Sequence, residues 1–238
     1  ALMVNEEDHL RIQVLGAGLA IQELFDRTQS IMRSLERSID FAFHPRFGYL
    51  TSCPTNVGTG MRISVMLHLP ALVQSKHIEK VFNAVAKMNL AVRGFYGEGT
   101  KALSDFYQIS NQMTLGKTPE ELLDSVRPVL PKIVMFEREL RDKILREDRL
   151  VLEDRVWRAF GTLTHARSMS SDEAFQLLSM IRMGVHVGLV PDLNIETVNE
   201  LFLMAQPGHL QMLRGGAGLE PKERDVVRAQ LIRERLER

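Results

Sequence analysis

The sequence predicts an α+β protein: an antiparallel β-sheet flanked by helices, followed by an all-helical C-terminal domain. Short alternating segments and nine of the sixteen glycines lie before Lys117, which is typical of a mixed region. After Thr118 strand patterns nearly vanish and helix-start signals recur. Because the first of these later helices can complete the layer that flanks the sheet, we expect a first, mixed domain over 1–146 and a helical domain over 147–238.

The first region contains two segments whose residues alternate as in strands. In 61–69, four apolar side chains share one face, which we expect to face the core: Ile63, Val65, Leu67 and Leu69. In 4–15, Leu10 and Ile12 lie opposite a polar face that includes Glu7 and Arg11, so we expect a second strand there. Apolar residues at three- and four-residue steps predict a helix over 21–39, and a further helix is expected over 75–88.

The second region carries local helix-start signals. Thr118-Pro119-Glu120-Glu121 is a capping box with proline at the first helical position, and Ser170 and Asn194 head similar patterns. Pro128 and Pro131 are expected to shorten or kink the first of these helices. The charged run 132–158 predicts one long helix.

Composition excludes several classes of protein. The chain has 238 residues, enough to bury a core, and its 30 basic and 30 acidic side chains balance to zero, which disfavours disorder and a generally cationic nucleic-acid or membrane binder. One cysteine excludes an internal disulfide framework. No apolar run is long enough for a membrane span and no signal peptide is evident, so we expect a soluble, cytoplasmic chain. Its abrupt start suggests that an upstream segment is missing.

Three arginines occupy positions that packing does not explain: Arg11 in the first strand, Arg62 after a glycine-rich turn, and Arg93 in a glycine-rich loop. Guanidinium groups bind phosphate oxygens in pairs and keep their charge, so such a cluster suits a polyphosphate. Glu7 on the expected strand and Glu98 in the loop after Arg93 could hold a cationic co-substrate. Each arginine taken alone is more often a solvated surface cation.

Other nucleotide and metal signatures are absent from the sequence. It has neither the P-loop pattern nor a dinucleotide fingerprint, and its seven histidines show no helical zinc-ligand spacing. We therefore expect structural or surface roles for the histidines.

Three motifs in order carry a resemblance to a known family. They are Val4-Asn5-Glu6-Glu7-Asp8-His9-Leu10-Arg11, the segment from Leu50 through Thr51-Ser52-Cys53-Pro54-Thr55-Asn56-Val57-Gly58-Thr59-Gly60-Met61 to Arg62, and Val92-Arg93-Gly94 with Gly97-Glu98. Together they resemble the catalytic domain of the ATP:guanido phosphotransferases. The helical remainder and Tyr107-Gln108-Ile109-Ser110-Asn111 are similar to the bacterial protein-arginine kinase branch of that family.

The resemblance implies a role for each matching residue. Glu7 matches the carboxylate that takes a proton from the guanidinium, and Glu98 matches a second carboxylate brought in by loop closure. Cys53 matches a reactive cysteine beside the guanidinium, although a lone cysteine is usually a small buried hydrophobe. The family's ATP phosphates are bound by arginines that match Arg11, Arg62 and Arg93. The expected cofactors are ATP and Mg²⁺; the magnesium arrives with ATP, Glu6 helps position it through water, and the protein itself supplies no metal site.

The C-terminal stretch Arg224-Asp225-Val226-Val227-Arg228-Ala229 resembles an Arg-Asp-x-x-Arg-Ala motif of the protein-arginine kinase branch. Two interpretations stay open. Arg224, Asp225 and Arg228 form either an allosteric phosphoarginine pocket or a solvated helix face. In the same domain an apolar stripe is either a dimerisation surface or monomer core; it consists of Val198, Leu201, Phe202 and Ala205.

The function implied by the resemblance is ATP-dependent phosphorylation of arginine side chains in proteins, which marks them for Clp-type proteolysis in the bacterial stress response. The implied partners are protein substrates with exposed arginine, a zinc-finger activator protein, a Clp-type AAA+ unfoldase, a transcriptional repressor as substrate, and a second copy of the chain. No membrane and no direct nucleic-acid partner are expected. Two alternatives remain. One is a kinase of free arginine, which the helical domain and Gln108 disfavour. The other is a non-catalytic phosphoarginine-binding module, because the family's Ser-x-Arg-x-Arg-x-x-Arg-Asn motif does not occur in the sequence.

Overall fold

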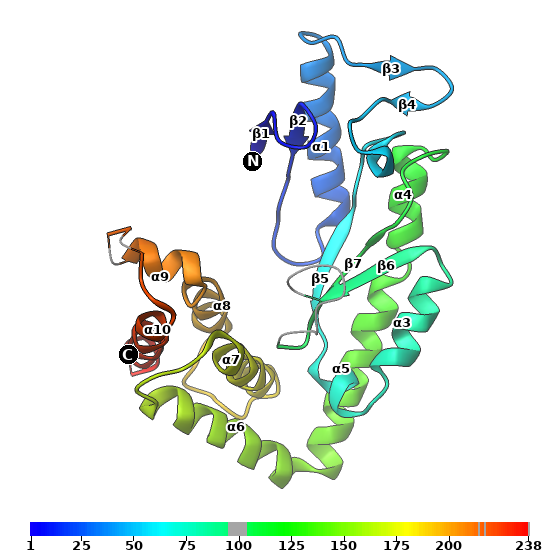
Figure 1. The fold of residues 1–238 in the computed structure, drawn as a ribbon. Coiled ribbons are helices and arrows are strands. Elements are labelled where there is room, and N and C mark those ends of the chain that lie inside the picture. Colours follow the sequence, from blue (N-terminus) through cyan, green and yellow to red (C-terminus); the bar gives the residue numbers. More distant parts are fainter. Residues whose placement is uncertain (95–103, 214, 217, 238) are drawn as a thin grey trace. The chain divides into compact units, whose positions relative to one another are not determined.

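The computed structural model describes residues 1–94, 104–213, 215–216 and 218–237 (Figure 1). The chain forms two compact units. The first unit comprises Ala1–Leu67, Glu79–Val92 and Gln108–Val134, and the second comprises His68–Ile78, Arg93–Tyr107 and Met135–Arg238. Small antiparallel sheets flanked by helices, followed by helices alone, confirm the expected α+β class. None of the helices in these ranges is long and apolar enough to cross a membrane.

The strands form three small sheets. Two are antiparallel pairs, β1 (Leu2–Val4) with β2 (Leu10–Ile12) and β3 (Phe43–His44) with β4 (Gly48–Tyr49). The third has the order β5-β7-β6, with β5 at Ser64–His68, β6 at Leu90–Gly94 and β7 at Phe106–Asn111. The ten helices of the described part are α1 (Ile21–Glu36), α2 (Pro70–Gln74), α3 (Ile78–Ala86), α4 (Pro119–Val126), α5 (Leu130–Glu147), α6 (Arg149–His165), α7 (Ser171–His186), α8 (Ile195–Met204), α9 (Pro207–Leu213) and α10 (Pro221–Leu236).

The single strand expected over 4–15 is wrong. The chain instead folds back between β1 and β2, with Leu2 opposite Ile12 and Val4 opposite Leu10. Asn5 adopts a left-handed conformation (φ 55°), and its amide donates to the carbonyl of His9 at 2.9 Å. Asparagine tolerates this conformation better than most residues, so it starts a turn where alternation alone indicates a strand.

Two expected helices differ from those in the structure. The helix predicted over 75–88 is present as α3 but begins only at Ile78, because Lys76 has a φ of +56° that no α-helix accommodates. The long helix predicted over 132–158 is α5 followed by α6, and the chain bends at Asp148, whose φ and ψ are −129° and 33°.

Strand β5 fits the expected alternation at its end. Leu67 and Leu69 are buried, whereas Met66 on the opposite face is 42% exposed. The Asn111 amide donates to the Ile63 carbonyl and the Leu69 amide to the Asp105 carbonyl, so β5 and β7 run antiparallel. His68, on the face expected to be polar, is nevertheless buried.

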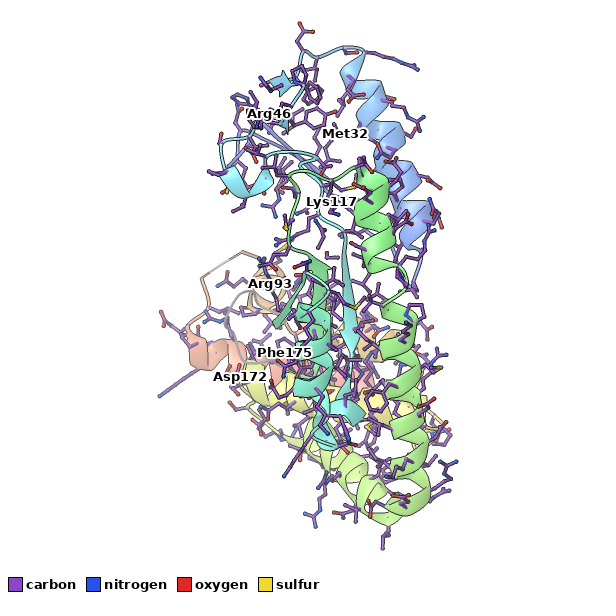
Figure 2. The ribbon with its side chains drawn as sticks, turned by 90° about the vertical axis from the view of Figure 1, so that its right-hand side faces the viewer. Met32, Arg46, Arg93, Lys117, Asp172 and Phe175 are labelled. Carbon is purple, nitrogen blue, oxygen red and sulfur yellow. The ribbon has the colours of Figure 1, made fainter. Side chains whose placement is uncertain are left out.

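The helices α6 to α10, all in the second unit, gather into one bundle (Figure 1). Its helix starts are those expected: the side chains of Ser170 and Asn194 accept from the amides of Glu173 and Thr197. Phe175 on α7 is 1% exposed and lies inside this bundle (Figure 2). The stripe with Val198 and its neighbours Leu201, Phe202 and Ala205 is also buried within the chain, so it is monomer core rather than a free dimer surface.

The capping box at Thr118 is formed as expected. Its side chain accepts from the Glu121 amide, and the Glu121 carboxylate accepts from the Thr118 amide, so α4 begins at Pro119. The helix ends at Val126, two residues before Pro128, and α5 starts at Leu130. Proline thus separates the two helices, because it lacks the amide hydrogen that a helix needs.

Candidate active site

The acidic turn between β1 and β2 holds the first candidate residues. Glu7 is exposed in this turn, and Arg11 is exposed on β2. Because the two lie on different elements, the expectation that they share one strand face is wrong. Arg11 Nη1 donates to both carboxylate oxygens of Glu6, at 3.0 and 3.3 Å. Both partners remain about half exposed, so a polyphosphate could compete with Glu6 for this guanidinium.

Asp8, to which the sequence analysis gives no role, connects this turn to the cysteine segment. Its Oδ1 accepts from the Ser52 amide at 2.6 Å and its Oδ2 accepts from Asn56 Nδ2 at 2.9 Å. The hydrogen bond from Asn56, followed by those from the backbone of Ser52 and Cys53, lowers the pKa of Asp8 despite opposing desolvation. Asp8 therefore holds the turn with Glu7 beside the segment with Cys53.

Cys53 lies just before the short 3₁₀ helix Pro54–Asn56 and is half-buried. Its Sγ is 3.0 Å from Thr55 Oγ1, and its carbonyl accepts from Thr51 Oγ1 at 2.7 Å. Either the thiol or the neighbouring hydroxyl can be the donor in this contact. The segment thus presents a polar surrounding for a residue that is more often a buried hydrophobe.

The turn before Arg62 is fixed by close backbone packing. Gly58 has a φ of +112°, and a Cβ there would lie 2.4 Å from the Thr114 carbonyl oxygen. The Thr114 hydroxyl in turn lies 3.0 and 2.8 Å from the carbonyl oxygens of Thr55 and Val57. These contacts leave room only for glycine and hold the turn in one conformation.

Asn111, at the end of β7, braces both sides of Arg62. Its Oδ1 accepts from the Ile63 amide at 2.7 Å and its Nδ2 donates to the Met61 carbonyl at 3.0 Å. The side chain is buried, whereas Arg62 is exposed. Asn111 belongs to a quoted motif, but nothing in its spacing signals that it supports the backbone of an arginine almost fifty residues earlier.

Two candidates of the catalytic region, Arg93 and Glu98, are not among the described residues of the first unit. Arg93 lies at the end of β6, in the second unit, where Figure 2 labels it. Glu98, together with Phe95 and Tyr96, lies outside the described residues. The structure therefore brings the Glu7 turn and the Cys53 segment together, while the expected convergence of all three arginines with Glu98 stays a prediction.

The C-terminal motif is built into the helical bundle through Arg228 on α10. This side chain is 1% exposed, and its Nε donates to the Ala205 carbonyl at 3.0 Å. Its Nη1 donates to the Met169 carbonyl at 2.7 Å and to Asp225 Oδ1 at 2.6 Å. Because its side chain is buried, Arg228 is not part of a solvated helix face. These acceptors offset the free-energy cost of burying a charged guanidinium.

Arg224 and Asp225 on α10 are more accessible than Arg228. Arg224 Nη1 donates to the Leu219 carbonyl at 2.6 Å, and the Asp225 side chain is 32% exposed. The buried Arg228 therefore holds the Asp225 carboxylate in place. Arg224 and Asp225 are both partly exposed, so a ligand could contact them. A hollow lined by Leu219, Lys222, Glu223, Val226 and Val227 lies on the same helix and the residues before it.

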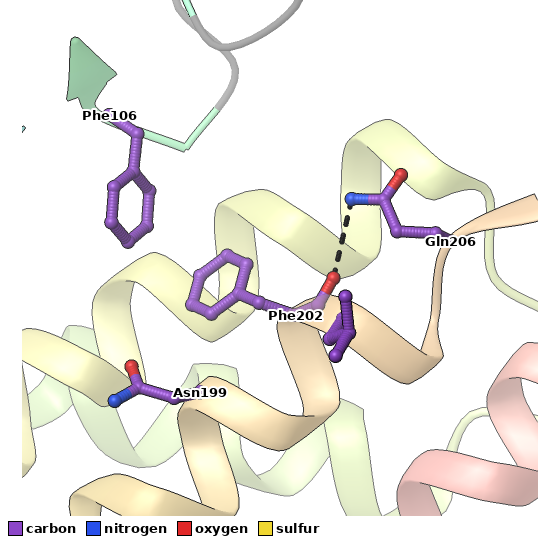
Figure 3. Close-up of a pocket in the computed structure, with 5 residues that line it drawn as sticks. Phe106, Asn199, Phe202 and Gln206 are labelled. Atoms are coloured by element: carbon purple, nitrogen blue, oxygen red, sulfur yellow. Dashed lines mark hydrogen bonds between the residues drawn. The ribbon is translucent and has the colours of Figure 1, made fainter. Parts of the chain in front are cut away.

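A second hollow of the helical unit, of about 240 Å³, is lined by Phe106, Asn199, Phe202, Leu203 and Gln206 (Figure 3). The Gln206 side chain donates through Nε2 to the Phe202 carbonyl at 3.3 Å. Its lining is mostly apolar and holds none of the candidate catalytic residues. In the described ranges no three His, Cys, Asp or Glu side chains are grouped so that they could hold a metal ion.

Two protein-family models match this chain. The model of the ATP:guanido phosphotransferase C-terminal catalytic domain matches residues 1–140, which contain the acidic turn, the Cys53 segment and Arg93. The chain therefore belongs to the ATP:guanido phosphotransferase family. The model described as the protein-arginine kinase McsB C-terminal domain matches residues 149–238.

Several curated proteins are similar to this chain over nearly its whole length, and all those named here are protein-arginine kinases. The Syntrophomonas wolfei protein is 47% identical over 100% of this chain and 66% of its own length. The Symbiobacterium thermophilum protein is 49% identical over 99% of this chain and 67% of its own length. The Bacillus subtilis protein is 44% identical over 99% of this chain. The chain thus spans about two thirds of the length of these relatives.

Solved structures show the same catalytic fold. Lombricine kinase has 30% sequence identity and a TM-score of 0.53, over 60% of this chain and 40% of its own. The duplicated taurocyamine kinase from Schistosoma mansoni, with bound transition state analog components, has 35% identity and a TM-score of 0.50, over 58% of this chain and 19% of its own.

Proposed function

We propose that the protein containing this chain is a kinase that transfers the γ-phosphoryl group of ATP to arginine side chains of proteins. The observation that carries the proposal is the combination of a guanido-phosphotransferase catalytic region with the helical C-terminal region in one chain, a combination shared with relatives named protein-arginine kinase. The contacts of Asp8, which hold the Glu7 turn beside the Cys53 segment, support the same proposal.

Glu7 has the chemistry that a guanidinium nucleophile requires. A guanidinium is protonated at neutral pH and its lone pairs are delocalised, so it attacks phosphorus only when a carboxylate aligns it and accepts a proton. Glu7 is exposed in its turn and can reach a guanidinium held near Cys53. Glu98 is proposed as the second carboxylate.

The arginines supply positive charge for the transferring phosphoryl group. Phosphoryl transfer needs in-line positioning and stabilisation of charge on the phosphate oxygens. Arg11 and Arg62 are exposed and can bind these oxygens, and Arg93 is proposed to join them. When bound with ATP, a magnesium ion would neutralise phosphate charge. We propose that Glu6 holds a water molecule of its hydration shell.

The C-terminal motif is proposed to bind phosphoarginine. Asp225 can accept from the guanidinium nitrogens of the ligand, while Arg224 donates to its phosphate. Binding there would give feedback from the product, or recognition of already marked protein. The finer biological roles belong to the same proposal: marking proteins for a Clp-type unfoldase and protease in stress, phosphorylation of a transcriptional repressor, regulation by a zinc-finger activator, a cytoplasmic location and homodimer formation.

Phosphorylation of free arginine is the rival activity, because the structural relatives are named as kinases of lombricine and taurocyamine. Incubation of the natural full-length protein with ATP, and with either free arginine or a basic protein, separates the two by mass spectrometry. We expect phosphoarginine in the protein and little on the free amino acid. Phosphorylation of free arginine alone would contradict the proposal, and no transfer to either would favour a non-catalytic phosphoarginine-binding module.

A Glu7→Gln variant in the same assay tests the catalytic assignment. The amide keeps the size of the side chain but cannot accept a proton, so we expect the rate to fall by a hundredfold or more, on the order of the contribution of general base catalysis. Glu36→Gln, an exposed position on α1, controls for the loss of one surface charge. A Glu7→Gln protein with the wild-type rate would remove Glu7 from the mechanism.

A further inference from the structure

Three buried or half-buried polar side chains of the second unit, those of His68, Asp105 and Ser179, are in contact next to the start of β7. Asp105 Oδ2 accepts from Ser179 Oγ at 2.8 Å, and Ser179 Oγ lies 2.9 Å from His68 Nε2. Asp105 precedes β7, His68 ends β5, and Ser179 is on α7 of the helical region. The family model of the catalytic domain covers the first two residues, and the C-terminal model covers Ser179.

The donor and acceptor roles in these two hydrogen bonds can be assigned. An ionised carboxylate only accepts, so the single hydroxyl hydrogen of Ser179 points to Asp105. The oxygen of Ser179 then accepts from His68, which carries its proton on Nε2. His68 is neutral in this arrangement, because burial and then the charges of Arg182 and Arg141 lower its pKa well below the ordinary value. The polar contacts thus run in one direction, from His68 through Ser179 to Asp105.

The backbone at this point is strained. Ser104 and Asp105 both have left-handed conformations, with φ of 62° and 58°, although neither is glycine. Such conformations cost free energy and persist only where the surroundings enforce them. The Asp105 carbonyl accepts from the Leu69 amide at 2.9 Å, so Asp105 is held through both its backbone and its side chain.

Aromatic packing fixes the next residue. The Phe106 ring lies 4.7 Å from the ring of His68 and 5.1 Å from that of Phe202 on α8, and the Arg182 guanidinium lies 5.3 Å above it. Figure 3 shows Phe106 and Phe202 on the same hollow. The start of β7 is therefore held by side chains of α7 and α8 as well as by β5.

Asp105 and Phe106 lie at the start of the strand that pairs with the strand carrying Arg93. β7 lies between β5 and β6 in the sheet, and β6 ends with Arg93 and Gly94. A displacement of Asp105 would shift β7, which pairs with the strand that carries Arg93.

We propose that Ser179 and Asp105 are positioning residues for phosphoryl transfer. Through the Ser179 hydroxyl, α7 of the helical region holds Asp105 in its left-handed conformation and thereby sets the strand pair that carries Arg93. This inference rests on the proposed function. It assigns the helical region a part in the chemistry that is independent of phosphoarginine binding at α10.

The test compares Ser179→Ala with Ser170→Ala in the natural full-length protein. Both changes remove one serine hydroxyl associated with α7, but Ser170 only caps the helix and does not contact Asp105. We expect Ser179→Ala to lower kcat on a protein substrate about tenfold to a hundredfold, as for slight misplacement of reacting groups. Ser170→Ala is expected to lower thermal stability and to leave kcat within about twofold of wild type, which corresponds to a small change in activation free energy.

Asp105 gives a second pair of variants. Asp105→Asn keeps an oxygen that accepts from Ser179 and suits the left-handed conformation, so we expect kcat near wild type. Asp105→Ala has neither property and is expected to resemble Ser179→Ala. A kcat of Ser179→Ala that equals that of Ser170→Ala, or an Asp105→Asn protein as impaired as Asp105→Ala, would overturn the inference.

Hydrogen exchange of the Leu69 amide provides a readout that does not depend on activity. We expect faster exchange in Ser179→Ala than in Ser170→Ala, because the acceptor of this amide is the Asp105 carbonyl. A wild-type protein that transfers no phosphate would defeat the proposed function and with it the positioning role. An active wild type with unchanged Leu69 exchange and kcat in Ser179→Ala defeats the inference alone.

Discussion

The carboxylate of Asp8 accepts a hydrogen bond from the backbone amide of Ser52 at 2.6 Å, although the two residues are 44 positions apart in the chain. Its second oxygen accepts from Asn56, so one side chain binds both ends of the segment with Cys53. The turn that presents Glu7 and the segment that presents Cys53 are therefore connected through this side chain. A shared guanidinium substrate requires such a fixed relationship.

Asp8→Ala is expected to reduce kcat/KM for the guanidinium substrate by about a hundredfold, because the Glu7 turn and the Cys53 segment lose their common anchor. Steady-state kinetics on the full-length protein measure the change. Asp26→Ala, which removes an exposed carboxylate of α1 bonded only to Gln22 among the described residues, serves as control. Equal kinetics for the two variants would show that Asp8 does not organise the site.

Arg11→Ala is expected to weaken catalysis without weakening the fold. Its ion pair with Glu6 is exposed, with side-chain exposures of 51% and 46%, so the free energy of unfolding should change by less than about 1 kcal/mol. Loss of a phosphate-binding donor should lower kcat on the order of a hundredfold. Chemical denaturation and phosphoryl-transfer rates separate the two effects. A large loss of stability with normal kcat would make Arg11 a structural residue.

The glycines of the turn before Arg62 should differ in their tolerance of a side chain. A Cβ on Gly58 would lie 2.4 Å from the Thr114 carbonyl oxygen, whereas one on Gly60 would have no neighbour nearer than 3.7 Å. Both have positive φ, so Gly60→Ala should cost about 1 kcal/mol and Gly58→Ala about 3 kcal/mol. Thermal unfolding measures this order, and equal costs would contradict the packing described for Gly58.

Arg224 and Arg228 are expected to fail in different assays. Arg228→Ala leaves Asp225 and two carbonyl groups without their buried donor, so it should cost about 3 to 5 kcal/mol of stability. Arg224→Ala should change stability by less than about 1 kcal/mol and abolish binding of free phosphoarginine. Calorimetric titration and denaturation test both. Unchanged phosphoarginine affinity in Arg224→Ala and Asp225→Ala would remove the proposed pocket.

Stability should fall as the pH drops below 6.5, because His68 is held neutral in the folded chain. Its pKa is lowered by burial, so the unfolded chain takes up the proton first, and stability present above pH 6.5 is lost toward the lower folded pKa. The slope from this residue reaches about 1.4 kcal/mol per pH unit. His186, whose pKa burial lowers to about 4, adds a smaller part because it is more exposed.

Denaturation between pH 7.5 and 5.5 measures this slope. His68→Gln should flatten it, while the exposed His165→Gln should leave it as in wild type. Burial raises the pKa of Asp105 and Glu137, so at still lower pH these two carboxylates take up protons in the folded chain before they do so in the unfolded chain. Their contribution therefore increases stability as the pH falls, opposite to that of His68. A slope that is the same in His68→Gln and wild type would contradict a neutral buried His68.

Local signals explain why much of the helical architecture was predictable. The starts at Thr118, Ser170 and Asn194 each depend on a side chain that bonds an amide three residues ahead, so nearby residues suffice to identify them. The late start of α3 after Lys76 and the bend at Asp148 are not predicted, since neither residue is a strong helix breaker. The same limitation turned a β-hairpin into one expected strand over 4–15.

The sequence by itself determined the α+β class, most helix starts and the motifs that place the chain in its family, because these are patterns of neighbouring residues. Tertiary structure alone decided that Asp8 braces the Cys53 segment, that Arg228 is buried under Asp225, and that Ser179 holds Asp105. The partners of Asp8 and Ser179 lie 44 to 111 residues away along the chain. Burial and hydrogen bonding at such separations depend on how the elements pack, which no local pattern of residues records.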